Sequence, residues 1–289
     1  MLEIGKHINS IIVGDSLSVL KTMPDCCIDC VITSPPYFGL RDYGTEGQIG
    51  LEDNPEDYVG KLVEVFHEIK RVLKDCGTLW LNLGDTWNGS KTGNTENVKH
   101  KKVNETMSFK KSLWSGAKRK DLIGIPWMTA FALRDDGWYL RNDIIWERPN
   151  AFPKTNPDRF SPSHEHIFLL SKSQTYYFDT EKSYEPTIDG VDRRRMRDVW
   201  SVNTCAGNGS HVAPFPEKLI EPMVLCGCPE GGIVMDPFIG SGTTGVVALR
   251  NGRNYIGIEL NETYAHEAEK RIGNVVDEII YKDNNPLGF

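Results

Sequence analysis

Residues 233–245 have the sequence Ile-Val-Met-Asp-Pro-Phe-Ile-Gly-Ser-Gly-Thr-Thr-Gly, and this stretch decides the expected fold. The apolar run Ile233–Met235 is typical of a short buried strand, and Thr243–Asn251 continues as a helix. The turn between them places glycines at the spacing Gly-x-Gly-x-x-Gly, at Gly240, Gly242 and Gly245. Between a strand and a helix, such glycines allow a tight turn and bring a cofactor close to the backbone.

The residues around this turn indicate which cofactor it binds. The next expected strand, Tyr255–Ile258, ends at Glu259, whose carboxylate can accept hydrogen bonds from both hydroxyls of a ribose. No Gly-Lys-Ser/Thr sequence is present, so a phosphate-cradling P-loop is excluded. Asp236 does not suit a pyrophosphate at the helix N-terminus, but it suits a cationic ligand. The turn therefore favours S-adenosylmethionine, which has a sulfonium and an ammonium group and no phosphate.

Apolar runs elsewhere in the chain extend this unit into a larger sheet. Near the N-terminus, three runs are typical of strands buried on both faces: Ile11–Val13, Cys30–Ile32 and Thr78–Leu81. Apolar residues within Tyr58–Leu73 recur at helical spacing, and the order strand, helix, strand predicts a parallel α/β sheet. The later expected elements are the helices Pro126–Asp135, Glu217–Cys226 and Glu262–Ile272 and the strands Ile144–Trp146 and Ile167–Leu170.

A second turn, Ser34-Pro35-Pro36-Tyr37, follows the expected strand Cys30–Ile32. Its two prolines fix φ and remove two N–H donors, which leaves a rigid edge of carbonyl acceptors beside a hydroxyl and an aromatic ring. Such an edge can accept hydrogen bonds from an amino group while Tyr37 stacks on a planar ring. Taken alone, this tetrapeptide is more often only a stiff loop.

Together the two turns resemble the amino-directed DNA methyltransferases of the permuted group, in which the catalytic turn precedes the cofactor turn. Residues 32–37 are similar to the catalytic motif in its Thr-Ser-Pro-Pro-Tyr form, and residues 235–245 to the cofactor motif. Residues 211–219 resemble the segment that lines the methionine end of the cofactor. Gly14-Asp15 resembles the acidic position that contacts the adenine amino group.

This resemblance extends from about Ile11 to Ile272 and implies a Rossmann-like α/β methyltransferase fold. The implied sheet has seven strands and is mostly parallel, with Ile167–Leu170 as its one antiparallel strand. The implied catalytic residues are Ser34, Pro35, Pro36 and Tyr37. The implied cofactor site consists of Asp15, Thr33, Phe215, Asp236, Pro237, Phe238, Gly240, Ser241, Gly242, Thr243 and Glu259.

The implied reaction is methylation of an exocyclic amine in double-stranded DNA, on a base flipped out of the duplex. Ser34 resembles the cytosine-N4 group, whereas the adenine-N6 enzymes more often have Asp or Asn at this position, so adenine-N6 remains the alternative. Methylation at cytosine C5 needs a cysteine that is usually presented as Pro-Cys, and the chain has only the reverse order, Cys228-Pro229.

Charge is distributed unevenly along the chain. The net charge is −7, from 33 Lys and Arg against 40 Asp and Glu, yet residues 91–120 hold nine Lys and Arg against two Glu. Such a run is ordinarily a solvated surface, but in a base-flipping enzyme it predicts contacts with phosphates. The chain is expected to form a single catalytic domain, residues 1–289. Two irregular inserts in it are therefore expected to recognise DNA: residues 86–120 and 172–210. The expected contacts are Lys101, Lys102, Lys110, Lys111, Trp114, Lys118, Arg119, Arg193, Arg194 and Arg195.

Composition limits the remaining possibilities. The chain has the ordinary apolar content of a globular protein and lacks both a membrane-spanning run and a signal peptide, so a cytoplasmic location is expected. Its seven cysteines are expected to be reduced thiols rather than metal ligands. The other classes left open are an NAD-dependent oxidoreductase and a non-catalytic DNA-binding module. RNA is a second candidate substrate, and a cognate restriction endonuclease is a candidate partner.

Overall fold

The computed structural model describes residues 1–40, 44–89, 113–152, 157–187, 190–205 and 215–284, with side chains up to residue 281. Within these ranges eight strands form one sheet in the order β1-β10-β9-β2-β3-β5-β4-β8. Their bounds are Ser10–Val13 (β1), Ile28–Thr33 (β2), Leu73–Leu83 (β3), Tyr139–Glu147 (β4), His164–Ser171 (β5), Val199–Ser201 (β8), Ile233–Asp236 (β9) and Asn254–Glu259 (β10).

Strand direction confirms the expected mostly parallel sheet. Strands β1, β10, β9, β2 and β3 pair in parallel, whereas β5 pairs antiparallel with both β3 and β4. The expected antiparallel strand Ile167–Leu170 lies within β5. The sheet has eight strands rather than the seven expected, because β8 pairs in parallel with the end of β4.

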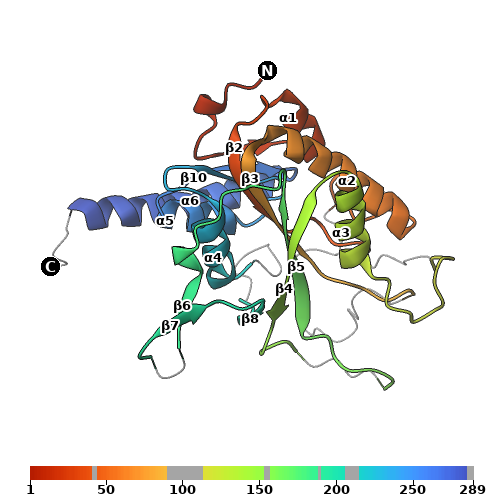
Figure 1. Cartoon of the computed structure of the whole chain (residues 1–289). Helices are drawn as coiled ribbons and strands as arrows, with labels where there is room; N and C mark the ends of the chain where they lie inside the picture. The colour runs from red at the N-terminus through yellow and green to blue at the C-terminus, as the bar shows by residue number, and fades with distance from the viewer. Residues whose placement is uncertain (41–43, 90–112, 153–156, 188–189, 206–214, 285–289) are drawn as a thin grey trace, which may run out of the picture.

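Helices cover both faces of the sheet (Figure 1). One face packs against α1 (Ser16–Thr22), α2 (Pro55–Val72) and α3 (Ile125–Asp135), in a cluster that includes Leu62 and Phe66. The other face packs against α4 (Glu217–Gly227), α5 (Thr243–Arg250) and α6 (Glu262–Asn284), in a cluster that includes Trp80 and Met223. Within β2, Val31 belongs to the first cluster and its neighbours Cys30 and Ile32 to the second, which explains why this run of the strand is apolar on both faces.

The boundary between α2 and β3 differs from the expectation. The side chain of Asn54 accepts a hydrogen bond from Asp57 N and caps α2, so the helix begins at Pro55. The helix ends at Val72, and Leu73, expected to be its last residue, is the first residue of an eleven-residue strand. The exposed residues Asp75 and Cys76 hide the start of this strand in the sequence, because only the part from Gly77 onward is continuously buried.

The insert 172–210, expected to be irregular, contains short strands besides β8. Strands β6 (Tyr184–Pro186) and β7 (Arg193–Arg195) form an antiparallel hairpin that follows the 3-10 turn η3 (Glu181–Ser183); near the N-terminus, η1 (Ile4–Lys6) is another 3-10 turn. Part of the other insert is also ordered: the Asn88 side chain bonds to the backbone at Trp114, Ala117 and Lys118. None of the helices in the described ranges is both long and apolar enough to cross a membrane.

The chain reverses its winding between β9 and β2. From β9 it crosses to β10 through α5 on one face, and from β2 it crosses to β3 through α2 on the other face. In open α/β sheets, ligands bind outside the carboxyl ends of the strands at such a switch point. Both turns singled out in the sequence leave the sheet there, after Thr33 and after Asp236.

Candidate active site

A hydrogen bond between neighbouring strand ends joins the two turns. The hydroxyl of Thr33, the last residue of β2, donates to Asp236 Oδ1 at 2.7 Å. The same oxygen accepts from Phe238 N at 3.0 Å, and Asp236 Oδ2 accepts from the Thr244 hydroxyl at 2.7 Å. Burial raises the pKa of the Asp236 carboxyl to about 6, even though these donors favour its ionised form. Asp236 therefore fixes the cofactor turn to the strand that carries the catalytic turn.

The cofactor turn has the conformation that its glycines suggested. Gly242 is the N-cap of α5 with φ of +80°, in the left-handed region that favours glycine. Gly245 lies where a Cβ would be 2.8 Å from Ile272 Cδ1, so its lack of a side chain lets α6 pack against α5. The Ser16 hydroxyl donates to Pro237 O at 2.6 Å and ties the turn to the start of α1.

Carboxylates surround this part of the site. Glu259 ends β10 and accepts from Gly240 N at 3.0 Å and from Asn261 N at 2.9 Å. Burial raises the pKa of the Glu259 carboxyl. Asp15 accepts from Ser18 N at 2.9 Å and caps α1 from the neighbouring strand end.

The catalytic turn is held by a network of hydrogen bonds. The Ser34 hydroxyl donates to the Tyr37 hydroxyl oxygen at 3.2 Å, and the Tyr37 hydroxyl donates to Glu165 Oε2 at 2.6 Å. Because Ser34 Oγ donates its proton to Tyr37, its lone pairs are left as acceptors. Burial and the Glu165 carboxylate raise the pKa of Tyr37 well above its ordinary value, so the phenol stays protonated. The Tyr58 hydroxyl donates to Pro36 O at 2.9 Å and anchors the turn from α2.

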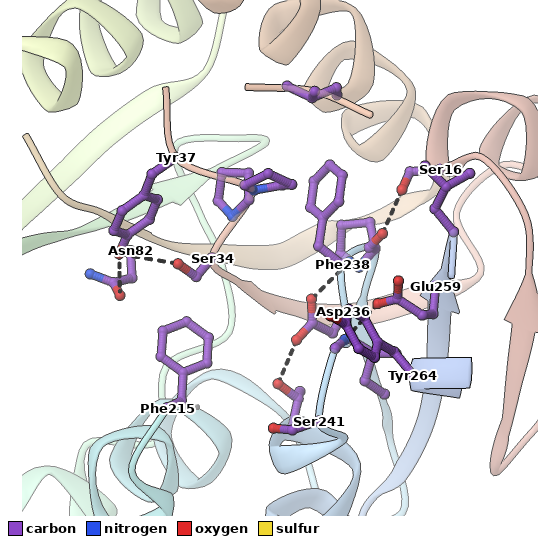
Figure 2. A pocket seen from close by; sticks show the side chains of 18 of the residues that line it. Ser16, Ser34, Tyr37, Asn82, Phe215, Asp236, Phe238, Ser241, Glu259 and Tyr264 are labelled. Atoms are coloured by element: carbon purple, nitrogen blue, oxygen red, sulfur yellow. Dashed lines mark hydrogen bonds between the residues drawn. The ribbon is translucent and has the colours of Figure 1, made fainter. Parts of the chain in front are cut away.

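Both turns line one cavity of about 370 Å³. Figure 2 shows Ser34 and Tyr37 on one side of it, Asp236, Ser241 and Glu259 on the other, and Phe215 opposite Ser34. All but two of the residues implied for the catalytic and cofactor sites line this cavity. The exceptions are Thr33, which is buried behind the wall, and Gly242.

The cofactor half of the cavity suits S-adenosylmethionine. Three carboxylates line it, from Asp15, Asp236 and Glu259, which favours a ligand with a positive charge over one with phosphates. The rings of Phe238 and Tyr264 supply apolar walls for a planar base. The residues present therefore fit a nucleoside that has a cationic sulfonium group.

Several wall residues were not anticipated from the sequence. These residues line the cavity from positions at or next to the ends of β3, β4 and β5: Asn82, Trp146, Arg148 and Glu165. Asn82 and Arg148 follow expected strands, Trp146 ends one, and Glu165 precedes one. That position was the only available signal, and it did not distinguish these residues from others near strand ends.

The described residues among those expected to bind DNA do not line this cavity. Lys101, Lys102, Lys110 and Lys111 fall outside the described residues. Lys118 and Arg119 are exposed on the loop that follows β3. Trp114, expected to contact DNA, is half-buried against the cluster that includes Leu62 and Phe66.

The arginine cluster forms strand β7. Arg193 and Arg194 pair with Glu181 and Glu185, each at 2.9 Å, and Arg193 and Arg195 lie over the ring of Tyr184. These contacts hold the arginines on a defined hairpin, and the two ion pairs offset part of their charge.

The described cysteines are free thiols. Cys30, Cys226 and Cys228 are buried, and burial raises the pKa of the Cys30 thiol to about 12 and of the Cys226 thiol to about 11. Within the described ranges, no three His, Cys, Asp or Glu side chains are grouped as they would be to hold a metal ion.

The chain is similar to known DNA methylases over most of its length. The DNA methylase family N6_N4_Mtase matches residues 28–270. The type II methyltransferase M.SmaI of Serratia marcescens is 51% identical over 264 residues, which cover 91% of this chain and 90% of that protein. M.Cfr9I of Citrobacter freundii, another type II methyltransferase, is 48% identical over 259 residues, covering 90% and 86%.

A solved structure has the same fold. A protein described as a DNA modification methylase from Thermus thermophilus, complexed with S-adenosyl-L-methionine, superposes with a TM-score of 0.65 at 27% identity, over 93% of this chain and 96% of that one. The family match covers more than half of the chain, from β2 into α6. This chain belongs to the N6/N4 DNA methylase family.

Proposed function

We propose that the protein transfers a methyl group from S-adenosylmethionine to the N4 amine of a cytosine flipped out of double-stranded DNA. The main support is the hydrogen bond between Thr33 and Asp236, because it brings the catalytic turn and the cofactor turn to one cavity. The cofactor is the one named for the solved relative, and the acidic wall of the cavity fits it. In this chain the catalytic turn precedes the cofactor turn, which is the order of the permuted group.

The chain contributes mainly position and polarity to this reaction. The amine of cytosine is a weak nucleophile because its lone pair is delocalised into the ring. Ser34 Oγ and the carbonyl of Pro35 accept hydrogen bonds from the amine hydrogens and favour a pyramidal nitrogen. When bound, S-adenosylmethionine would supply the methyl group: the amine nitrogen would form the N–C bond as the C–S bond breaks, with the bonding pair left on sulfur and one amine proton lost to solvent. Alignment of the two reactants in one cavity accounts for much of the rate.

The choice of cytosine rests on Ser34. Cytosine-N4 enzymes resemble this chain at that position, whereas most adenine-N6 enzymes have Asp or Asn there. Adenine-N6 is the alternative, and the two targets are distinguished by the modified nucleoside that is formed.

Duplex DNA is the proposed substrate, with the inserts 86–120 and 172–210 as its recognition regions. Because the relatives are type II methyltransferases, we also propose a restriction endonuclease of the same specificity as the partner. A planar base that leaves the duplex can stack on Tyr37, whose ring borders the cavity beside Ser34.

The proposal is tested with Ser34→Ala. We expect this variant to bind S-adenosylmethionine with an unchanged Kd by calorimetry and to transfer labelled methyl about 100-fold more slowly. Ser173→Ala is the matched control, because the Ser173 hydroxyl is exposed and bonds to Asp75 O outside the cavity. Mass spectrometry of digested DNA should show N4-methylcytosine. Unchanged turnover in Ser34→Ala, or N6-methyladenine as the product, would overturn the proposal.

A further inference from the structure

The end of the cavity away from the cofactor turn has its own polar group. Arg148 follows β4 there and lies beside Trp146 and Glu165. Of the described residues that line the cavity, Arg148 is the only basic one. None of the motifs that indicated the function includes it.

Arg148 is held in a fixed position. Its Nη1 donates to Glu165 Oε1 at 2.6 Å, and its Nη2 donates to His164 O at 3.4 Å. The guanidinium carbon lies 5.7 Å from the centre of the Trp146 ring. The other Glu165 oxygen accepts from the Tyr37 hydroxyl, so one carboxylate connects Arg148 to the catalytic turn.

The guanidinium has more donors than its described partners use. It carries five N–H groups, and Glu165 and His164 accept from two of them. Arg148 Nε is buried, and within the described ranges it has no hydrogen-bond partner. The terminal nitrogens Nη1 and Nη2 each keep a second N–H, so the guanidinium can donate to a ligand in the cavity that supplies acceptor atoms.

The ion pair indicates which kind of ligand this is. Glu165 and Arg148 are both mostly buried, with 11% and 20% of their side chains exposed, and their charges cancel. A phosphate would need an uncompensated cation. A neutral group with acceptor atoms on one edge fits better, and the cavity already includes the Ser34 hydroxyl for an adjacent amine.

We propose that Arg148, positioned by Glu165, recognises the N3 and O2 acceptors of the flipped cytosine. The inference rests on the proposed function and assigns the residue that selects the base. Cytosine presents two acceptors beside its N4 amine, which match the fork of a guanidinium. Adenine presents only N1 beside its N6 amine, followed by a C–H. Arg148 therefore favours cytosine over adenine in the same cavity.

The test combines protein variants with a modified base. The methylated position is first located by sequencing modified bases in DNA from expressing cells. Duplexes are then made with cytosine or with 3-deazacytosine at that position; the analogue keeps the amine and O2 but lacks the N3 acceptor. Single-turnover methyl transfer is measured for the full-length wild type, for Arg148→Met, and for Arg148→Met combined with Glu165→Gln, which leaves no unpaired buried carboxylate.

We expect the analogue to slow the wild type at least tenfold and to slow both Arg148 variants less than threefold relative to their own rates on cytosine. Arg159→Met is the matched control: Arg159 Nε is also buried without a partner in the described residues, but Arg159 is not part of the cavity wall. On 3-deazacytosine, Arg159→Met should be slowed as much as the wild type is. S-adenosylmethionine affinity, measured by calorimetry, should be unchanged in all variants.

The assignment would be overturned if 3-deazacytosine slowed the wild type and both Arg148 variants equally. That result is expected if Arg148 contacts a phosphate or has a purely structural role. This failure differs from failure of the proposed function. In the first case the wild type still forms N4-methylcytosine, and in the second it does not.

Discussion

At the scale of single residues, we expect Asp236 to make cofactor binding depend on pH. Its pKa of about 6 means that the carboxyl is neutral below pH 6 and ionised above it. A sulfonium cation binds better beside the ionised form, so S-adenosylmethionine should bind about tenfold more weakly at pH 5 than at pH 7.5. Calorimetry across this range measures the effect. The Asp236→Asn variant should bind S-adenosylmethionine weakly, and its affinity should change much less with pH. If its affinity changed with pH as steeply as that of the wild type, Asp236 would not be the group that titrates.

The free protein should show the opposite trend from the same group. Because burial raises the folded-state pKa above the ordinary 3.8, the contribution of Asp236 to stability is fully present below about pH 4 and is lost as the pH rises through 6. Saturating S-adenosylmethionine offsets this loss by binding the ionised form. Denaturant unfolding of the wild type and Asp236→Asn with and without cofactor, from pH 4 to pH 7.5, measures this contribution. If the difference in free energy of unfolding between the two proteins did not change with pH, the pKa of Asp236 would not be raised in the folded state.

The sequence indicated many of the residues that border the cavity, but it did not indicate their hydrogen-bond partners. It suggested that Asp236 suits a cation, but both carboxylate oxygens are engaged by Thr33, Phe238 N and Thr244. Thr33 is 203 positions away along the chain, so no local pattern could reveal that bond. Arg148 and Glu165 escaped notice for the same reason, because their significance depends on strands β4 and β5 lying side by side.

At the scale of elements, the packing of α5 against α6 depends on Gly245. A Cβ there would lie 2.8 Å from Ile272 Cδ1 and 3.1 Å from Tyr255 Cδ2. Gly245→Ala should therefore lower the free energy of unfolding by about 1–3 kcal/mol in urea titrations. Gly60→Ala is the matched control: Gly60 is exposed in α2 with nothing within 4 Å of a Cβ, so this change should stabilise by about 0.4–1 kcal/mol. Equal effects of the two changes would contradict this packing.

Elements buried on both faces were the easiest to predict. The strands β2 and β9 are apolar runs that end in small or polar residues, and both appear where expected. The hairpin of β6 and β7 was missed because ion pairs and the ring of Tyr184 hold it rather than an apolar face. Strand β8 was missed for a related reason: it has three residues, two of them exposed, and therefore shows no periodicity.

At the scale of the whole molecule, acidic and basic side chains are concentrated in different parts. The acidic cavity lies at the carboxyl edge of the sheet. Strands β6 and β7 of the hairpin lie on the lower side of the molecule in Figure 1, and Lys118 and Arg119 are exposed on the loop after β3. The net charge of −7 thus reflects the scaffold, whereas local charge on these loops predicts where a polyanion binds.

Salt dependence of DNA binding tests this separation. Removing one side chain that binds a phosphate should reduce the slope of log K against log salt by about 0.9, so Lys118→Gln with Arg119→Gln should reduce it by about 1.8. Lys6→Gln with Lys21→Gln removes the same charge from η1 and α1, outside both inserts, and should leave the slope unchanged. Fluorescence anisotropy with a labelled duplex from about 50 to about 200 mM salt measures both slopes. If the two double variants reduced the slope equally, DNA would be attracted by net charge alone. A smaller slope in the Lys118 and Arg119 double variant alone would place the phosphates against the loop after β3.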